Sequence, residues 1–399
     1  MSRSQPRLLD DPARVATRQA DPAARQADPA ARQADPAARR AHPATVADPV
    51  VAGAWQAAIL AWYDARGRTL PFRGTRDPYA ILVSETMAQQ TQISRVGPAW
   101  AAFMARFPTI GALAAATPAD VLRAWQGLGY NRRALNLQRA ARIVVAEHGG
   151  RLPRDVAALE RLPGIGPYTA RAVAAIAFGA PVGAVDTNVR RVLGRVVAGD
   201  PALIRPAELQ ELADRLTPAS RAADWTHALM DVGSTFCRSQ GPRCPDCPAR
   251  PWCRHAAAAQ SRPDPARPEV LAARRSPVPP PARRPAFERT TRWLRGRIID
   301  RACEVPGASW ARFDGPIGAH PPDAVAAMLA VLAGEGLLEL ATHDRRLARL
   351  PHEGGEGSGR AAAERAAAER TAADRTAADR TAAATIERRP GGSTPEAGP

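Results

Sequence analysis

Four of the five cysteines in this 399-residue sequence lie between positions 237 and 253, and their spacing suits metal binding. Intervals of six, two and five residues separate Cys237, Cys244, Cys247 and Cys253. In a reducing compartment, cysteines grouped in this way indicate metal binding in preference to disulfides. Structural zinc and a [4Fe–4S] cluster both use four thiolates, so the spacing by itself leaves both open.

A second motif, Leu-Pro-Gly-Ile-Gly at 162–166, lies between two segments with helical patterns. A Gly-x-Gly turn at a helix N-terminus exposes backbone N–H groups and the positive end of the helix dipole. Such a turn can bind a DNA phosphate without reading the base sequence. We therefore predict that Gly164 and Gly166 contact a DNA backbone. The alternative is an ordinary turn between two helices.

Two carboxyl groups, those of Glu85 and Asp186, could divide the work of acid catalysis. Glu85 falls on the largely apolar side of a predicted helix in YAILVSETMAQQTQI, where burial would raise its pKa and keep it protonated. Asp186 stands where a helix begins in GAVDTNVRRVLGR, and the helix dipole there favours the charged form. Cleavage of an N-glycoside needs one carboxyl of each kind. The alternatives are a boundary glutamate paired with an arginine and a simple helix N-cap.

Helices are expected to position these residues. From about 50 to 255, apolar residues recur at helical spacing between short Gly and Pro breaks, with almost no alternating strand pattern. We predict an all-α domain over 50–255 and, because of its Pro and Arg content, a linker over 256–286. Two helical segments followed by two short strand-like runs predict a small winged-helix-like domain over 287–351.

Both ends of the chain are repetitive. Residues 18–39 repeat RQADPAA three times, with a helix-breaking proline in each copy. Residues 360–383 repeat five-residue units such as RTAAD and lack an apolar stripe. We expect a disordered leader over 1–49 and a disordered tail over 352–399.

The formal net charge is +16, and all 55 basic residues are arginine because the sequence contains no lysine. A basic surface fits a polyanionic partner such as nucleic acid, although an arginine-biased proteome would explain the charge equally well. No apolar run approaches the roughly 18 residues of a membrane span, and the N-terminus lacks the apolar core of a signal peptide. We expect a soluble, intracellular protein without a membrane partner.

Together these motifs resemble the adenine DNA glycosylases of the MutY type, members of the endonuclease III, or helix-hairpin-helix, superfamily. The resemblance runs in one unbroken order through LPFR, SETMAQQTQ, GLGYNRRALNL, LPGIGPYTA, VDTNVRRVL and the cysteine cluster. It implies two helical subdomains and hydrolysis of the N-glycosidic bond of adenine mispaired with 8-oxoguanine or guanine, in base excision repair. The implied partner is double-stranded DNA containing such mispairs, bound by a monomer in the bacterial cytoplasm, at the nucleoid.

The resemblance also implies a role for each matching residue. Glu85 would protonate the extruded adenine, and Asp186 would stabilise the oxocarbenium sugar electrostatically or through a transient covalent bond. Tyr168 and Asn188 would line this site, and Arg73 would contact the adenine. Gln90 and Tyr130 would wedge into the base stack beside the mispair. The four clustered cysteines would hold a [4Fe–4S] cluster.

Three features depart from the family pattern. Phe72 stands where the family usually has tryptophan, and His227 stands where a Gln or Glu often approaches the adenine. The family's usual C-terminal domain, which resembles a Nudix hydrolase and recognises 8-oxoguanine, has no recognisable counterpart in 287–351. Cys303 lies outside the cluster and is expected to be a small buried apolar residue.

Three other functions are compatible with parts of this motif set. A bifunctional endonuclease III-type enzyme needs a lysine amine where this sequence has Tyr168, so we expect no lysine-dependent lyase activity. A thymine mismatch glycosylase of the same superfamily can also lack this lysine, but Glu85 followed by QQTQ favours adenine. A non-catalytic iron–sulfur DNA-binding protein is the third alternative, and the presence of both Glu85 and Asp186 argues against it.

Overall fold

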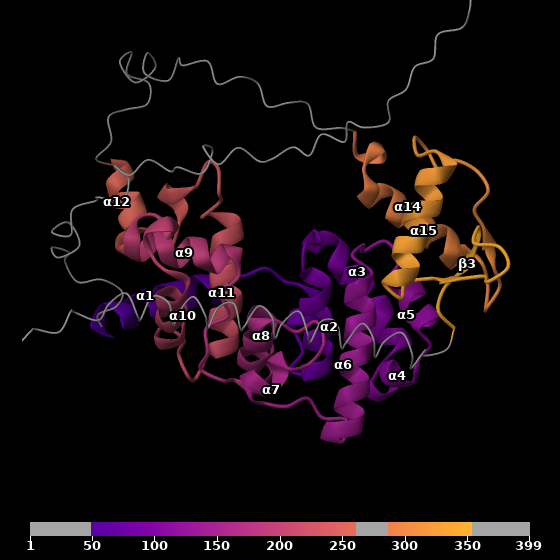
Figure 1. The fold of residues 1–399 in the computed structure, drawn as a ribbon. Helices are drawn as coiled ribbons and strands as arrows, with labels where there is room; N and C mark the ends of the chain where they lie inside the picture. Colours follow the sequence, from indigo (N-terminus) through magenta and orange to yellow (C-terminus); the bar gives the residue numbers. More distant parts are fainter. Residues whose placement is uncertain (1–48, 261–285, 353–399) are drawn as a thin grey trace, which may run out of the picture.

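The structure is a computed structural model that describes residues 49–260 and 286–352 (Figure 1). Nearly all of the predicted leader and tail, and most of the predicted linker, lie outside the described residues. The described part contains two groups of helices and a C-terminal module. None of its helices is both long and apolar enough to cross a membrane.

The first helical subdomain is formed by one continuous part of the chain and carries Glu85. Its helices are α2 (Pro78–Ala88), α3 (Ile93–Arg106), α4 (Ile110–Ala115), α5 (Pro118–Ala124), α6 (Arg132–His148), α7 (Val156–Glu160) and α8 (Pro167–Phe178), preceded by the 3₁₀ turn η4 (Pro71–Arg73). Capping residues start several of these helices: the side chains of Asp77, Thr109 and Thr117 each accept a backbone N–H. Glycines with positive φ, Gly149 and Gly179, end α6 and α8.

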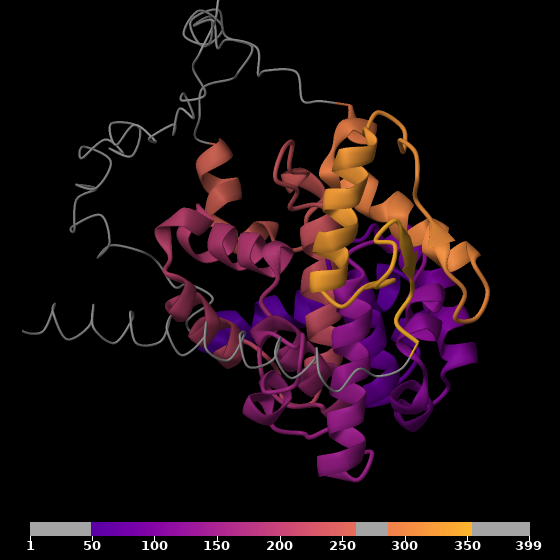
Figure 2. The same ribbon diagram turned by 45° about the vertical axis from the view of Figure 1, so that its right-hand side comes forward.

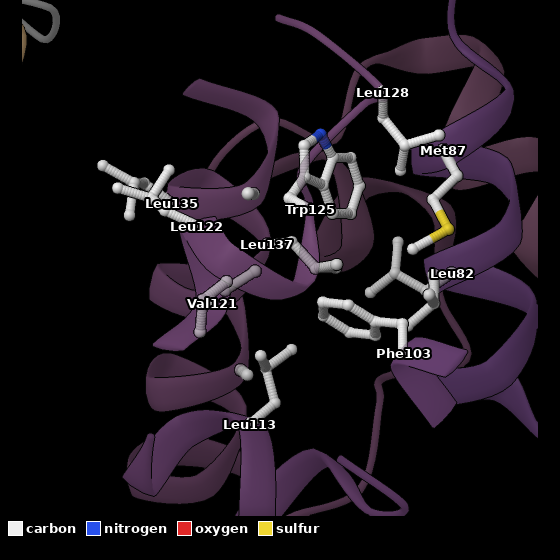
Figure 3. Packing of buried hydrophobic residues seen from close by; sticks show 14 of the residues in the cluster. Leu82, Met87, Phe103, Leu113, Val121, Leu122, Trp125, Leu128, Leu135 and Leu137 are labelled. Carbon is white, nitrogen blue, oxygen red and sulfur yellow. The ribbon is translucent and has the colours of Figure 1, made fainter. Parts of the chain in front are cut away.

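Large apolar side chains fill the centre of this subdomain (Figure 3). Trp125 and Phe103 are fully buried, and their rings meet edge to face with centroids 5.8 Å apart. Leu82 and Met87, both on α2, reach into the same cluster. Because α2 is buried along nearly its whole length, the core fixes the helix that carries Glu85.

The second helical subdomain joins the first described helix to the segment that follows Asp186. It contains α1 (Pro49–Arg66), α9 (Thr187–Ala198), α10 (Pro206–Arg215), α11 (Ala222–Thr235) and α12 (Arg254–Gln260), with the 3₁₀ turns η5 (Pro201–Leu203), η6 (Cys244–Asp246) and η7 (Arg250–Trp252). Trp55 on α1 packs edge to face on Trp225 of α11, with ring centroids 5.0 Å apart, and both are buried. The N-terminal helix thus completes the core that positions α9 and α11.

The C-terminal module contains η8 (Phe287–Arg289), α14 (Thr291–Glu304), β1 (Ala311–Arg312), α15 (Pro322–Gly334), β2 (Glu339–Leu340) and β3 (Leu347–Arg349). The strands form an antiparallel sheet in the order β1-β3-β2, with Ala348 of β3 opposite Ala311 of β1 and Leu340 of β2. Both helices and the β2–β3 pair lie where the sequence predicts them, and β1 is additional. The winged-helix assignment stays a prediction.

This module packs against α5 of the first subdomain, and Figure 2 brings it toward the viewer. Arg123 donates to the carbonyl oxygens of Val305 and Gly307, at 3.0 and 2.9 Å, and the Ala119 N–H donates to the Pro351 carbonyl at 3.0 Å. Its buried residues also belong to the same apolar cluster as those of α2–α8. The module is therefore docked on the helical core.

The predicted all-α character of 50–255 agrees with the structure, which has no strand within the described residues 49–260. The predicted boundary at 255 falls inside α12, so helix continues into the segment expected to be a linker.

Candidate active site and its DNA-facing loops

Glu85 lies on α2 with its side chain almost fully buried, at 8% exposure. The Tyr168 hydroxyl, from α8, donates to Glu85 Oε2 at 2.8 Å. Burial raises the pKa of Glu85, and the negative charge of Asp186 raises it further, against the opposing effects of the Tyr168 hydrogen bond and of Arg73. The position thus favours a protonated carboxyl, which is the form that can donate a proton.

Tyr168 is held in its neutral form beside Glu85. Burial raises the pKa of the phenol well above its usual value, and the carboxyl groups of Glu85 and Asp186 raise it further. A neutral phenol keeps its proton for the hydrogen bond to Glu85. Tyr168 therefore orients one oxygen of that carboxyl, which leaves the other available to a substrate.

Asp186 caps the N-terminus of α9, the helix that follows α8 in the sequence. Its Oδ1 accepts the Val189 N–H at 2.6 Å, and its Oδ2 accepts from Asn188 Nδ2 at 2.8 Å. Both contacts are donated to oxygens of its carboxyl group, which lies at the positive end of the α9 helix dipole. The structure thus brings Glu85, Tyr168 and Asp186 close enough to interact, and Asn188 is hydrogen-bonded to Asp186.

The Asn188 side chain is also held by a hydrogen bond from Arg191. Arg191 Nη2 donates to Asn188 Oδ1 at 2.8 Å and to the Gly233 carbonyl at 2.9 Å, and its Nε donates to the Cys237 carbonyl. A Cβ at Gly233 would lie 2.6 Å from Asn188 Cβ, so only glycine lets α11 approach so closely. The cysteine loop is therefore linked to the Asp186–Asn188 pair through one side chain.

Asp231 is a site residue that sequence reasoning missed. It is fully buried on α11, where it accepts from the Arg68 backbone N–H at 2.9 Å and from Arg68 Nε at 2.6 Å. Arg73 Nη1 and Nη2 reach its two oxygens at 2.7 and 2.8 Å. Burial by itself would raise the pKa of Asp231, but hydrogen bonds from Arg73 and Arg68 outweigh it and lower that pKa. An aspartate within the apolar run HALMDVG was the only sequence signal.

This ion pair bears on the role predicted for Arg73. Two of its donors are engaged by Asp231, and Nη1 also reaches the Arg68 carbonyl at 3.2 Å, so the guanidinium is held in place before any substrate enters. Its charge still acts on Glu85 and opposes the rise of the Glu85 pKa. Direct contact of Arg73 with adenine stays a prediction. His227, also on α11, is buried, which lowers its pKa to about 3 and keeps it neutral.

Gln90 and Tyr130 share an unusual backbone conformation. Among the described residues, they are the only ones other than glycine with positive φ, at 54° and 48°. Such a backbone costs about 1–3 kcal/mol and persists where the surrounding structure imposes it, often at functional sites. Both residues are exposed, as their predicted insertion into DNA would require.

A single arginine on α6, Arg133, forms hydrogen bonds with the backbone of both loops. Its Nη1 donates to the Thr86, Met87 and Gln89 carbonyl oxygens, which α2 leaves without helical partners at its C-terminus. Its Nη2 donates to Gly129, on the other loop, at 2.9 Å. The guanidinium also lies 5.6 Å from the Tyr130 ring centroid. Burial lowers the pKa of Arg133 to about 10, so it stays charged near neutral pH.

The predicted glycine turn lies directly beside the loop that carries Gln90. Gly164 has φ +78°, and a Cβ there would lie 2.7 Å from Asn136 Cβ, so the turn requires glycine. Gly166 is the N-cap of α8, so the first backbone N–H groups of that helix have no acceptor within the helix. One cavity is lined by residues of this turn and by Gln89 and Arg133. The structure thus places the turn and both exposed loops on neighbouring parts of the surface.

The four clustered cysteines line a second cavity together, with Arg195 and Arg250 at its edge. All four are free thiols, and burial raises the pKa of Cys247 to about 12. Within residues 49–260 and 286–352, no three His, Cys, Asp or Glu side chains converge closely enough to hold one metal ion. Four thiolates are the donor set of a structural zinc and also of a [4Fe–4S] cluster, so the residues that line this cavity fit either group.

The chain is similar to known DNA repair proteins. Residues 83–218 match the family model described as "HhH-GPD superfamily base excision DNA repair protein". An adenine DNA glycosylase of Mycolicibacterium smegmatis is 50% identical over 194 residues, which are 48% of this chain and 66% of that protein. Another of Mycobacterium tuberculosis is 41% identical over 256 residues, 62% of this chain and 79% of that protein. Among solved structures, that of a thermostable thymine-DNA glycosylase has a TM-score of 0.49 and 30% identity, over 52% of this chain and 97% of that one.

The matched family model defines the class as the helix-hairpin-helix base excision repair proteins. Within this class, the chain belongs to the family of adenine DNA glycosylases. The predicted resemblance is thus confirmed. The chain spans about two thirds of the first of these relatives, so its own substrate and partners are matters of proposal.

Proposed function

We propose that this protein is a monofunctional glycosylase that releases adenine mispaired with 8-oxoguanine or guanine. The observation that carries the proposal is the buried Glu85 carboxyl, whose pKa is raised and which Tyr168 orients at 2.8 Å. Asp186, the N-cap of α9, supplies the second carboxyl group, which acts as a carboxylate beside the protonated acid. This pairing is what hydrolysis of an N-glycosidic bond needs, and a purely DNA-binding protein has no use for it.

In the proposed reaction, Glu85 gives its proton to a ring nitrogen of the extruded adenine. The bond between the base and C1′ of the sugar then breaks, and its electron pair leaves with the base. The positive charge that develops on the sugar is stabilised by Asp186, which Asn188 and the Val189 N–H hold in place. Water then adds to C1′ and gives up a proton to the Glu85 carboxylate, which restores the acid and completes the hydrolysis. The product is an intact strand with an abasic site.

Extrusion of adenine is assigned to the exposed loops. The scissile bond is inaccessible inside a duplex, so a base must leave the stack and something must take its place. Gln90 and Tyr130 are exposed, and Arg133 holds both of their loops. Gly164 and Gly166 would bind a phosphate of the same double-stranded DNA with backbone N–H groups. One copy of the chain contains every group that this reaction uses.

The substrate is tested by single-turnover assays on duplexes that contain A:8-oxoguanine, A:G, A:T and T:G pairs. We expect adenine release from the first two only. Release of thymine from T:G would instead indicate a thymine mismatch glycosylase. DNA binding without release of any base would indicate a non-catalytic protein, provided that the cysteine site is loaded.

We also propose that Cys237, Cys244, Cys247 and Cys253 hold a [4Fe–4S] cluster. When bound, it would cross-link the loop that contacts Arg191 and take no part in bond cleavage. Protein purified without air should contain about four irons per chain. Cys247→Ala should lose most of this iron, whereas Cys303→Ala, outside the site, should keep it. Stoichiometric zinc in protein prepared without air from iron-replete cells would contradict the proposal.

The absence of lysine leads to a further expectation about the product. A lyase needs an amine that forms a Schiff base with the abasic sugar, and Tyr168 cannot supply one. We expect the DNA strand to stay intact until alkali or heat is applied, and borohydride to trap no adduct. An endonuclease III-type enzyme serves as the positive control. A strong covalent adduct with this protein would show that another amine acts.

A further inference from the structure

Arg292, at the start of α14, lies against the side chain proposed to enter DNA. Its guanidinium carbon is 4.5 Å from the centroid of the Tyr130 ring, although the two residues are far apart in the sequence. The ring is 42% exposed and projects from a loop held in positive φ. The C-terminal module thus reaches the one aromatic side chain that the first subdomain presents in this conformation.

Two other arginines of α14 face carboxylates, and Arg301 lies over the buried Phe313 ring at 5.2 Å, whereas Arg292 lies over an exposed ring. Arg295 makes two hydrogen bonds to the Glu335 carboxylate, at 2.9 and 2.6 Å. Arg297 lies 3.6 Å from Asp300 on its own helix. Within the described ranges 49–260 and 286–352, Arg292 makes no hydrogen bond or ion pair, and its side chain is exposed. A planar cation with five free N–H donors is therefore held over an exposed ring.

The position of this cation favours a base over a phosphate as its target. An aromatic ring that replaces an extruded base lies within the base stack, and a guanidinium over its face lies one stacking step away, closer to the bases than to the phosphate backbone. If a DNA base stacks on this face of the Tyr130 ring, the Arg292 guanidinium would have to move from the ring to the edge of that base. Base edges in this region present acceptors that suit a guanidinium fork.

We propose that Arg292 recognises the purine left opposite the extruded adenine, by donating to its O6 edge. This inference rests on the proposed function, because it assumes that Tyr130 enters the duplex at the mispair. Arginine contacts guanine through O6 and N7, and 8-oxoguanine keeps the O6 acceptor. The short C-terminal module would in this way read the strand opposite the extruded adenine.

The test compares three variants on matched duplexes. Arg292→Ala removes the group, and Arg292→Lys keeps the charge but loses the planar fork. Arg297→Ala, on the same helix, is the control for a surface charge. Dissociation constants are measured with an adenine nucleoside that cannot be hydrolysed, placed opposite guanine, opposite 8-oxoguanine or opposite an abasic analogue. A salt series is run for each, and thermal unfolding shows whether the variants are folded.

We expect both Arg292 variants to bind the guanine and 8-oxoguanine duplexes about tenfold more weakly, or worse, and the abasic duplex within about twofold of wild type. Arg297→Ala should affect all three duplexes alike. Equal weakening of all three by Arg292→Ala, with a salt slope smaller by about one, would show a phosphate contact and overturn the proposal. No change at all would show that the contact only holds the module in place.

This design separates the inference from the proposed function. If wild-type protein binds the purine mispairs selectively but releases no adenine, the proposed function fails while the role of Arg292 is still decided by binding. If adenine is released normally and Arg292→Lys binds all duplexes like wild type, only the inference fails.

Discussion

Glu85→Gln is expected to lower the single-turnover rate of adenine release by about 10²- to 10⁴-fold, the range typical for loss of a general acid. Glutamine can still accept the Tyr168 hydrogen bond, so the site should keep its shape. Because phosphate contacts dominate DNA affinity, duplex binding should stay within a few-fold of wild type. Adenine release at nearly the wild-type rate would show that another group is the acid.

The pH dependence of this reaction follows from the same carboxyl. Burial raises the pKa of Glu85, and the acid acts only when protonated, so the wild-type rate should fall as pH rises through that raised pKa. His227 should not contribute near neutral pH, since burial lowers its pKa to about 3. The residual rate of Glu85→Gln should lack this alkaline decline.

Stability gives an independent check on the Glu85 pKa. A carboxyl whose pKa is raised on folding favours the native state at low pH and loses that contribution as pH rises through the folded pKa. Glu85→Gln should therefore increase the free energy of unfolding relative to wild type more at pH 8 than at pH 5. The opposite trend would mean that Glu85 is stabilised as a carboxylate, and hence that it is poorly suited to donate a proton.

The second large effect is expected at Asp231. Asp231→Asn removes the charge that both Arg68 and Arg73 face, while it keeps the shape of the side chain. Breaking a buried pair by removing one partner costs about 3–5 kcal/mol, because the remaining charge is left without compensation. Denaturant unfolding near neutral pH should show a loss of this size.

Asp64→Asn is the matched control for Asp231→Asn. Asp64 on α1 pairs with Arg221, at 2.5 Å, but its side chain is 54% exposed, and solvent screens such a pair so that it contributes little to stability. The pKa of Asp231 is lowered on folding, so its contribution is present above the unfolded pKa and is lost as pH falls through the folded one. The difference between the two variants should therefore shrink in acid. Equal destabilisation by both variants at neutral pH would contradict the importance of the buried pair.

The sequence predicted the roles of those residues whose patterns extend over only a few neighbouring positions. The burial of Glu85 was predictable because helical periodicity repeats over three or four residues, and α2 is buried as expected. Asp186 was recognisable as a helix start, because capping depends on the next three residues. The glycine turn and the cysteine spacing are similarly short patterns. Each of these predictions needed only the neighbours along the chain.

Other features depend on residues that the chain brings together from a distance. Nothing near Asp231 indicates that Arg68 and Arg73 face it, since they lie at the other end of the helical domain's sequence. Arg133 gave no local sign that it would join the loops of Gln90 and Tyr130, because its acceptors are backbone carbonyl oxygens, which every residue has.

The sequence by itself determined the helical character of the domain, the carboxyl pair, the glycine turn and the clustered thiols. The tertiary structure alone decided which charges are compensated, and it placed Arg292 of α14 over the Tyr130 ring. The physical reason is one of range. Helix propensity and capping act within a single turn of backbone, whereas burial and ion pairing depend on how separate helices pack.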